Sequence, residues 1–385
     1  MRVEAGHAGA MCVLARPTLL LDTEGPMTGF FRFSLAGSFV LALTISSCGG
    51  EEPNADDGAS GGQGGEPSLG SGGESDTGGT GGTGGTGPVK PTGPPELLSE
   101  TGLFEDDMET LAARVRAYEP RFVLWSDNAE KRRWISLPEG EQIDTTEPDY
   151  WRMPAGTKLW KEFTRDGVRV ETRLLHKQTD GSWWRVSYHW NDEQTDATAV
   201  PEGLQNASGT DHDIPSVEDC STCHGNTTGT VLGFSAVQLA HDDSEYNLDD
   251  LTTEGVLSAP VIVQPVPGTA DQQAILGYFH VNCGTCHNPT SSVQARVDMD
   301  LRLRFDSSTD VTETPLYVTA VGIEVAVTDG DVPAATLRID PGFPETSAVY
   351  LRLHSRGQGY SMPPVGSEDI DEAPAAAIAV WIESL

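Results

Sequence analysis

The chain has 385 residues, and 58 acidic residues against 24 basic ones give it a formal net charge of −34. This charge argues against nucleic acid as a partner, because a phosphate backbone requires a basic footprint. An acidic surface can steer the chain toward a basic partner protein, although it also suits a surface that is merely soluble.

Residues 1–48 contain an export signal. Arg32 precedes an apolar run from 33 to 45, which is too short for a confident membrane span, and Cys48 follows two serines. This arrangement is similar to a bacterial lipoprotein signal, in which Cys48 carries the lipid and becomes the first mature residue. Residues 1–26 have no role in such a signal, so we expect translation to begin at Met27.

Residues 49–95 consist mostly of Gly, Ser, Thr, Asp and Glu, with almost nothing apolar. Such a segment cannot bury enough apolar surface to fold, and we expect a disordered linker between the lipid and the body of the protein. Gly49 after the lipidated cysteine resembles lipoproteins sent to the outer membrane. The expected location is therefore the cell envelope, with the chain anchored by lipid to the outer membrane.

Residues 96–258 predict an antiparallel β-rich domain. Asp106 or Asp107 can cap a helix that runs to Tyr118. The hydrophobic period then changes to two over 157–163, 168–177 and 183–190, with Asp-Gly turn signals between these runs. A two-residue turn at 166–167 places Leu159 opposite Leu174, and a three-residue loop over 180–182 places Leu174 opposite Tyr188.

Two C-x-x-C-H motifs follow, Cys220 to His224 and Cys283 to His287. This is the attachment signature of c-type haem: two thiols on one side of a turn add to the vinyl groups of one porphyrin, and the adjacent histidine ligates the iron. Of the 6 cysteines, Cys12 precedes the expected start and Cys48 carries lipid, so the other four form the two haem pairs. We predict two haems c, held by Cys220, Cys223, Cys283 and Cys286, with His224 and His287 as proximal ligands.

The sixth ligand of the first haem stays open in the sequence. The candidates by residue type are His176, His189, His212, His241 and Met153, and an open position is equally allowed.

Residues 259–385 have the pattern of an all-α class I cytochrome c module. Thr269 and Gln272 form a capping box for a helix in which Gly277 permits close approach by another helix, and Asp371 can cap a last helix. Between them, a helix is expected around 348–354. The following loop supplies Met362 as the distal ligand of the second haem, because a thioether suits iron that keeps its coordination during electron transfer. Residues 296–336 form an insertion that reads as extra strands, because Met299, Leu301 and Leu303 alternate along the chain and Asp329-Gly330 is a turn signal.

Short stretches along residues 97–385 together resemble a bacterial family of exported dihaem c-type cytochromes. They are 101–104, 124–127, 131–135, 154–157, 171–175, 190–192, 220–224, 232–234 with 238–239, 282–289 and 362–364. The resemblance implies haem binding and electron transfer, and it names no substrate. Within these stretches Trp125, Asp127, Arg132, Arg133, Glu171 and Arg173 either line a site or determine the fold.

The sequence as a whole thus predicts an α+β multidomain protein, with a β-rich domain and then an all-α cytochrome c-like domain that has a strand-like insertion. Its expected function is electron transfer by a lipid-anchored dihaem cytochrome with a basic redox partner. Two alternatives stay open, a dihaem peroxidase-like oxidoreductase and a zinc-stabilised binding module, since paired C-x-x-C motifs also bind zinc.

Overall fold

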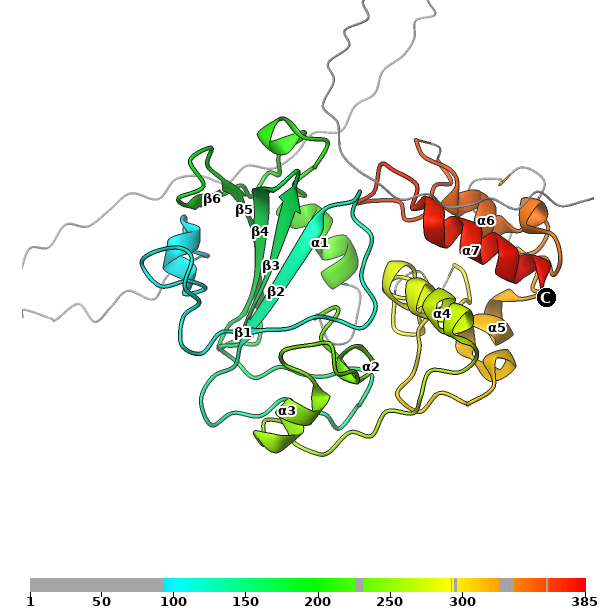
Figure 1. The fold of residues 1–385 in the computed structure, drawn as a ribbon, viewed down its shortest axis with the longest axis horizontal. Coiled ribbons are helices and arrows are strands. Elements are labelled where there is room, and N and C mark those ends of the chain that lie inside the picture. The colour runs from blue at the N-terminus through cyan, green and yellow to red at the C-terminus, as the bar shows by residue number, and fades with distance from the viewer. Residues whose placement is uncertain are drawn as a thin grey trace, which may run out of the picture. The chain divides into compact units, whose positions relative to one another are not determined.

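The computed structural model describes residues 93–225, 231–291, 293, 296–325, 332, 335–357 and 359–385, all within one compact unit, Gly84–Leu385. The described residues form an antiparallel sheet and a set of short helices, which confirms the mixed α+β class (Figure 1). The signal, Cys48 and nearly all of the linker lie outside the described residues.

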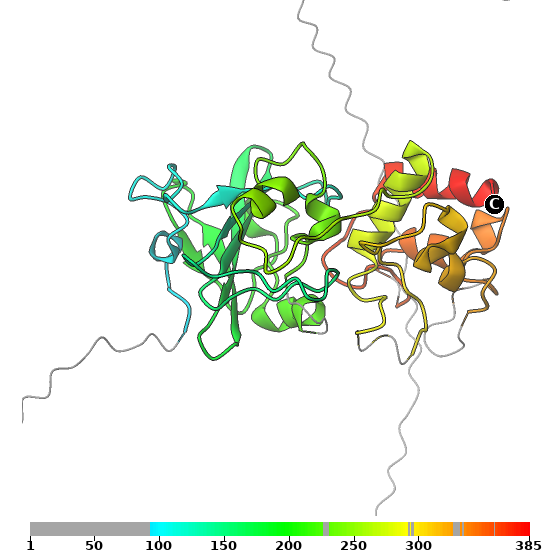
Figure 2. The same ribbon diagram turned by 90° about the horizontal axis from the view of Figure 1, so that it is seen from below.

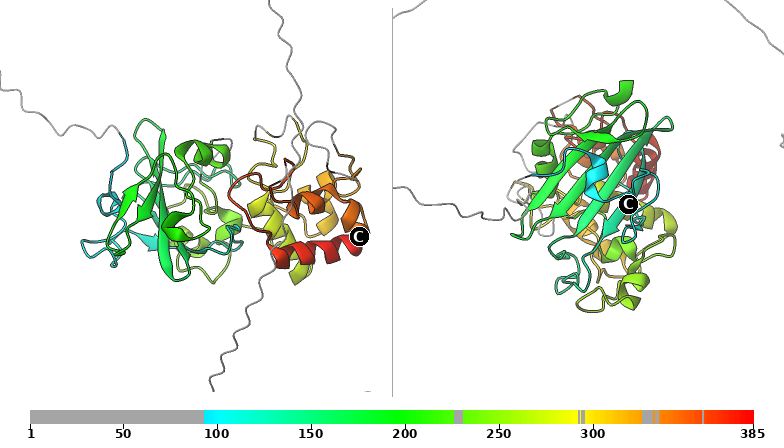
Figure 3. Two further views of the ribbon diagram at one scale, coloured as in Figure 1. Left: turned by 90° about the horizontal axis from the view of Figure 1, so that it is seen from above. Right: turned by 90° about the vertical axis from the view of Figure 1, so that its left-hand side faces the viewer.

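The sheet is a six-stranded meander in which each strand pairs with the next along the chain. Its strands lie side by side in Figure 3. They are β1 Arg116–Ala117, β2 Glu130–Ser136, β3 Lys158–Arg165, β4 Val168–Lys177, β5 Trp183–Trp190 and β6 Ala197–Ala199. The three strands predicted from the alternating pattern are therefore confirmed as β3, β4 and β5.

The first hairpin turn has the predicted length, but the strands beyond it are shifted. Asp166 and Gly167 both have positive φ, 51° and 80°, as a type I′ turn requires. A bulge between Phe163 and Thr164 then moves the register by one residue, so that Leu159 lies opposite Leu175 instead of Leu174. The bulge leaves Val170 unpaired in the ladder, and its side chain is fully buried.

The second hairpin differs from the prediction by two residues, because Leu174 lies opposite Val186 and not Tyr188. The Asp180 carboxylate accepts hydrogen bonds from the backbone amide and hydroxyl of Ser182, at 2.9 and 2.6 Å. These bonds close the turn around Gly181, and the Gln178 amide then donates to the Ser182 carbonyl at 2.8 Å. The turn consequently ends before Ser182. Since the error is an even number of residues, each side chain keeps its predicted face.

The predicted helix from Asp106 or Asp107 to Tyr118 is wrong, because this segment consists of turns that lead into β1. Asp107 does cap backbone groups, accepting hydrogen bonds from the amides of Glu109 and Thr110 at 2.9 and 2.7 Å. Met108 has a φ of 56°, which stops a right-handed helix at its start. The side chain of Met108 packs into the core beneath the sheet instead.

The helices are α1 Val217–His224, α2 Ala236–Leu239, α3 Leu248–Thr253, α4 Ala270–Asn282, α5 Pro315–Ala320, α6 Ala348–Leu353 and α7 Glu372–Glu383, with 3-10 turns at Leu98–Thr101, Ala207–Gly209, Val311–Glu313 and Pro344–Thr346. Helix α4 begins at the predicted capping box, and α6 matches the helix predicted around 348–354. Helices α4 and α7 pack against each other (Figure 2). Asp371 stands at the start of α7, but its side chain makes no capping hydrogen bond.

The three largest hydrophobic clusters among the described residues hold the unit together. One lies between a face of the sheet that includes Trp134 and Trp160 and the segment before β1, and a second joins Ile135 and Leu159, on the other face, to the α2 and α3 segments. The third consists of side chains from α4, α5, α6 and α7 with residues 299–303.

The described part of the predicted strand-like insertion, 296–336, contains α5 and isolated bridges rather than further named strands. Met299, Leu301 and Leu303 are buried as the alternating pattern suggested, but they pack into the helical core. The Asp329-Gly330 turn signal lies outside the described residues. No helix in the described ranges is long and apolar enough to cross a bilayer.

Candidate functional site

The first C-x-x-C-H motif occupies the last turn and a half of α1. Ser216 and Asp219 start this helix with a reciprocal capping box, so the helix begins one turn before Cys220. Cys220 and Cys223 then follow three residues apart, and both line a large cavity together with His224. Helix α1 lies against β5 of the sheet (Figure 1).

The second motif forms a tight turn at the end of α4. The Cys286 and His287 amides donate to the Cys283 carbonyl at 3.1 and 2.9 Å. The amide side chain of Asn288, which is fully buried, donates to the carbonyls of Gly284 and Thr285 at 2.9 and 2.8 Å. This turn faces the same cavity as the first motif.

The space around residue 284 at this turn admits only glycine. A Cβ added there would stand 2.6 Å from the carbonyl oxygen of His280, which belongs to the backbone of α4 and cannot move aside easily. The turn of the second motif therefore packs directly on its own helix.

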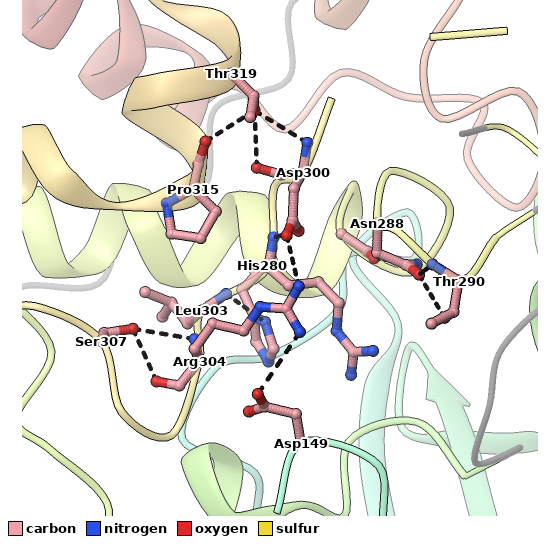
Figure 4. A network of polar contacts seen from close by, with 12 residues as sticks. Asp149, His280, Asn288, Thr290, Asp300, Leu303, Arg304, Ser307, Pro315 and Thr319 are labelled. Carbon is pink, nitrogen blue, oxygen red and sulfur yellow. Dashed lines mark hydrogen bonds and ion pairs between the residues drawn. The ribbon is translucent and has the colours of Figure 1, made fainter. Parts of the chain in front are cut away.

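A polar network holds the chain that follows the second motif (Figure 4). Arg304 donates to Asp300 at 2.6 Å and forms an ion pair of 3.6 Å with Asp149, from the segment between β2 and β3. The Leu303 amide donates to Nδ1 of the buried His280 at 3.1 Å. These contacts connect α4 to the sheet-forming part of the chain.

Thiols from the two motifs meet inside the cavity. Cys223 and Cys286 hydrogen-bond to each other, which lowers the pKa of Cys223 to about 7 and raises that of Cys286. Burial raises the pKa of Cys283 to about 12 and raises that of Cys220. All four thiols are free, and all four predicted attachment residues line the same cavity.

His287 is prepared to act as a ligand. Burial, together with the charges of the nearby Arg338 and Arg352, lowers its pKa to about 4, so the ring is neutral at pH 7. Its Nδ1 is buried and has no hydrogen-bond partner. A buried ring nitrogen without a partner calls for an explanation, and an absent cofactor provides one.

Met362 and the two prolines after it line the same cavity. The Met362 amide donates to the Arg352 carbonyl at 3.1 Å, which ties this loop to α6. The Asp127 carboxylate accepts hydrogen bonds from the amides of Glu368 and Asp369 at 3.0 and 2.9 Å. A segment just before β2 thus holds the far end of the Met362 loop.

Of the five candidates for a sixth ligand at the first motif, only His212 lines this cavity. It is buried, and its Nε2 is 2.8 Å from a carboxylate oxygen of Glu171. His176 packs edge-on against Trp184, His189 contacts Ser208, and His241 contacts the carbonyl of Glu119. Met153 belongs to the hydrophobic cluster beside α2 and α3.

The cavity measures about 1180 Å³, which exceeds the range of about 300–1,000 Å³ that suits drug-sized ligands. Its lining combines the two motifs with aromatic and aliphatic side chains such as Trp125, Phe279 and Val349. Both an apolar wall and a group of cysteine and histidine side chains suit a large porphyrin. The four thiols, the neutral His287 and the volume therefore fit covalently attached haem.

Four basic side chains of the sheet also line the cavity, and the sequence singled out Arg133 and Arg173 among them but not Lys161 or Arg185. Arg133, Lys161, Arg173 and Arg185 extend from the sheet into the cavity lining. Arg132, which the sequence grouped with Arg133, lies on the other face and pairs with Glu162 at 2.7 Å.

The described residues contain no group of three or more His, Cys, Asp or Glu side chains arranged to hold a metal ion. Comparisons of the chain with models of protein families, with curated proteins and with solved structures gave no match. The resemblance to exported dihaem cytochromes therefore rests on the sequence stretches that carry it.

Proposed function

We propose that this protein is a dihaem c-type cytochrome that transfers electrons. The observation that carries the proposal is the meeting of both C-x-x-C-H motifs in one cavity, where Cys223 and Cys286 are in contact. Attachment points that adjoin each other suit two redox groups that exchange electrons. Two isolated motifs on opposite sides of the molecule would not suit such an exchange.

The residues assigned to each haem follow from the motifs. Cys220, Cys223 and His224 would hold the first haem, and Cys283, Cys286 and His287 would hold the second. The haem iron supplies reversible one-electron oxidation and reduction when bound. The chain contributes the thiols, the neutral histidine ring and an apolar wall that lowers solvent access to the iron.

The finer fold assignment is part of this proposal. Helices α4 and α7, which pack against each other, and the Met362 loop would form a class I cytochrome c-like unit around the second haem. A methionine sulfur as distal ligand raises the reduction potential, which favours an electron carrier over an enzyme with its own substrate.

The proposal places the protein at the cell envelope, with lipid on Cys48 and the segment 49–95 as a tether. The acidic chain would then meet a basic redox partner, since opposite charges speed association. Membrane fractionation of wild type and Cys48→Ala tests the anchor. We expect wild type in the membrane pellet and the variant in the soluble fraction. Equal partition of the two would contradict the anchor.

The decisive experiment is export of the full chain from a strain that attaches haem to proteins. We expect a mass increase equal to two haems and a sharp α-band on reduction. The double variants Cys220→Ser/Cys223→Ser and Cys283→Ser/Cys286→Ser should each lose one haem, whereas Ser221→Ala, within the first motif, should keep both.

Two other outcomes would replace the proposal. A colourless chain with bound zinc in fixed proportion would indicate the zinc-stabilised module. A coloured chain that oxidises a reduced donor at the expense of hydrogen peroxide would indicate the peroxidase-like enzyme.

A further inference from the structure

Three basic side chains stand in one row across the sheet. Arg133 in β2 pairs in register with Lys161 in β3, and Lys161 pairs with Arg173 in β4. Directly paired residues point to the same face with their Cβ atoms about 4.5–5.5 Å apart, and like charges in such positions repel. This cation row (Arg133, Lys161 and Arg173) also lines the cavity.

The acidic groups beside the cation row do not neutralise all of it. Glu171 is fully buried and binds Arg173 through both carboxylate oxygens, at 2.6 and 2.9 Å. The same carboxylate also contacts His212. Arg133 is 3.5 Å from Glu119, whose side chain is 49% exposed, so this pair is long and open to solvent.

Lys161 lacks a partner of its own. Within the described ranges it forms no hydrogen bond or ion pair, and its ammonium lies 4.6 Å from the centre of the Phe163 ring. Burial lowers its pKa well below the usual value, and the charges of Arg133 and Arg173 act in the same direction, whereas the Glu171 carboxylate acts the other way. Such a lysine is expensive to keep in the fold unless an anion joins it.

Further unsatisfied polar groups occupy the same face. Ser187 in β5 pairs with Arg173 and continues the row; it is 2% exposed, and its Oγ has no hydrogen-bond partner. Two residues before it, the buried Nε of Arg185 is also without a partner. Unsatisfied buried groups are few in native proteins, and two on one sheet face beside unpaired positive charge indicate a missing ligand.

We propose that the cation row is a binding site for one oxyanion, centred on Lys161 and adjacent to the first C-x-x-C-H motif. Arginine and lysine donors recognise carboxylate and phosphate-like oxygens through charge-assisted hydrogen bonds. The oxyanion is either a free ligand that enters the cavity or a carboxylate of the proposed cofactor. The site is built from the chain's own residues, and a free oxyanion there does not depend on the proposed function, whereas a carboxylate of the cofactor rests on it.

The test uses the full exported chain with inorganic phosphate as the probe, and calorimetry measures the affinity at constant ionic strength. We expect one phosphate per chain and a loss of affinity of about tenfold or more in Lys161→Met. Lys161→Arg should keep the binding because it keeps the charge. Lys131→Met is the matched control, since Lys131 lies on the same face of β2 as Arg133 but not in the cavity lining. The phosphate affinity of this variant should stay within about twofold of wild type.

A second readout separates the two sources of the oxyanion. If phosphate does not bind to the haem-loaded chain but Lys161→Met lowers the potential of the first haem more than Lys131→Met does, the oxyanion is a carboxylate of the cofactor. If Lys161→Met folds and changes neither phosphate affinity nor potential, the site does not exist. A chain that binds phosphate through Lys161 but takes up no haem would keep this inference and refute the proposed function.

Discussion

Replacement of Gly277 by alanine tests how tightly α4 is packed. A Cβ at this buried position would stand 2.0 Å from Cδ1 of Phe122 and 2.2 Å from its Cε1, far inside van der Waals contact. The ring cannot retreat with its backbone, because the Phe122 amide donates to the side chain of Gln238 at 2.9 Å and the Arg121 amide donates to the Gln238 carbonyl at 2.8 Å. The sequence anticipated a close approach here by another helix, whereas the neighbour is this aromatic ring.

The expected net effect is a loss of about 1–2 kcal/mol in the free energy of unfolding. Overpacking of a core costs about 1–3 kcal/mol. Alanine in a helix interior recovers about 0.5–1 kcal/mol relative to glycine. The cost of overpacking is the larger effect, so Gly277→Ala should lower the midpoint of urea-induced unfolding of the full chain. This unfolding is measured by circular dichroism at fixed temperature.

A double-mutant cycle identifies the cause of this loss. In a Phe122→Ala background the clash is relieved, because the ring and its Cγ are both removed, and Gly277→Ala should there be neutral or stabilising because only the helix preference remains. If Gly277→Ala stabilises the chain equally in both backgrounds, the packing of Phe122 on α4 is not as described, and the argument from the added Cβ fails.

Three further predictions concern the site. Met362→Ala should keep both haems by mass but lower the reduction potential of the second haem in a redox titration, because attachment depends on the cysteines and only the distal bond is lost. An unchanged potential would show that Met362 is not a ligand of the iron. Glu171 is buried, which raises its pKa, but the charge of Arg173 and the hydrogen bond from His212 more than offset this and hold the pKa at about 2, below the usual value of 4.5. Because the folded pKa is the lower one, Glu171 contributes stability above pH 4.5, of the order of 3 kcal/mol, and this stability is lost between about pH 4.5 and 2. Glu171→Gln should therefore flatten the dependence of the free energy of unfolding on pH in this range. An unchanged slope would count against the pairing of this carboxylate. Asp127→Asn keeps the shape but not the charge of the acceptor for the amides of 368 and 369, which should weaken this contact by about 1 kcal/mol. Proteolysis of the Met362 loop should therefore become faster. Equal cleavage rates would show that this contact does not hold the loop.

Sequence patterns located the strands β3, β4 and β5 and the helices α4, α6 and α7, because their signals are local. The Asp-Gly turn at 166–167 and the alternating side chains around it identified β3 and β4, and the capping box at Thr269 identified the start of α4. The same logic failed at Asp107, where a capping side chain was correctly recognised but serves a turn. Capping residues stabilise turns and helices alike, and the left-handed Met108 that decides between them carries no sequence mark.

The sequence by itself determined the mixed α+β class, the two C-x-x-C-H motifs and the methionine loop, since each depends on residues a few positions apart. Only the tertiary structure brought Cys223 to Cys286, because that contact joins helix α1 to the turn after α4, from distant parts of the chain. The cation row was also a tertiary result. With the predicted register Lys161 would lie opposite Thr172, and the single bulge at Phe163 and Thr164 moves it opposite Arg173. A one-residue shift exchanges the faces of a strand, and the bulge that causes it depends on how the buried Val170 packs against Ala207 and Ile214, which no local pattern specifies.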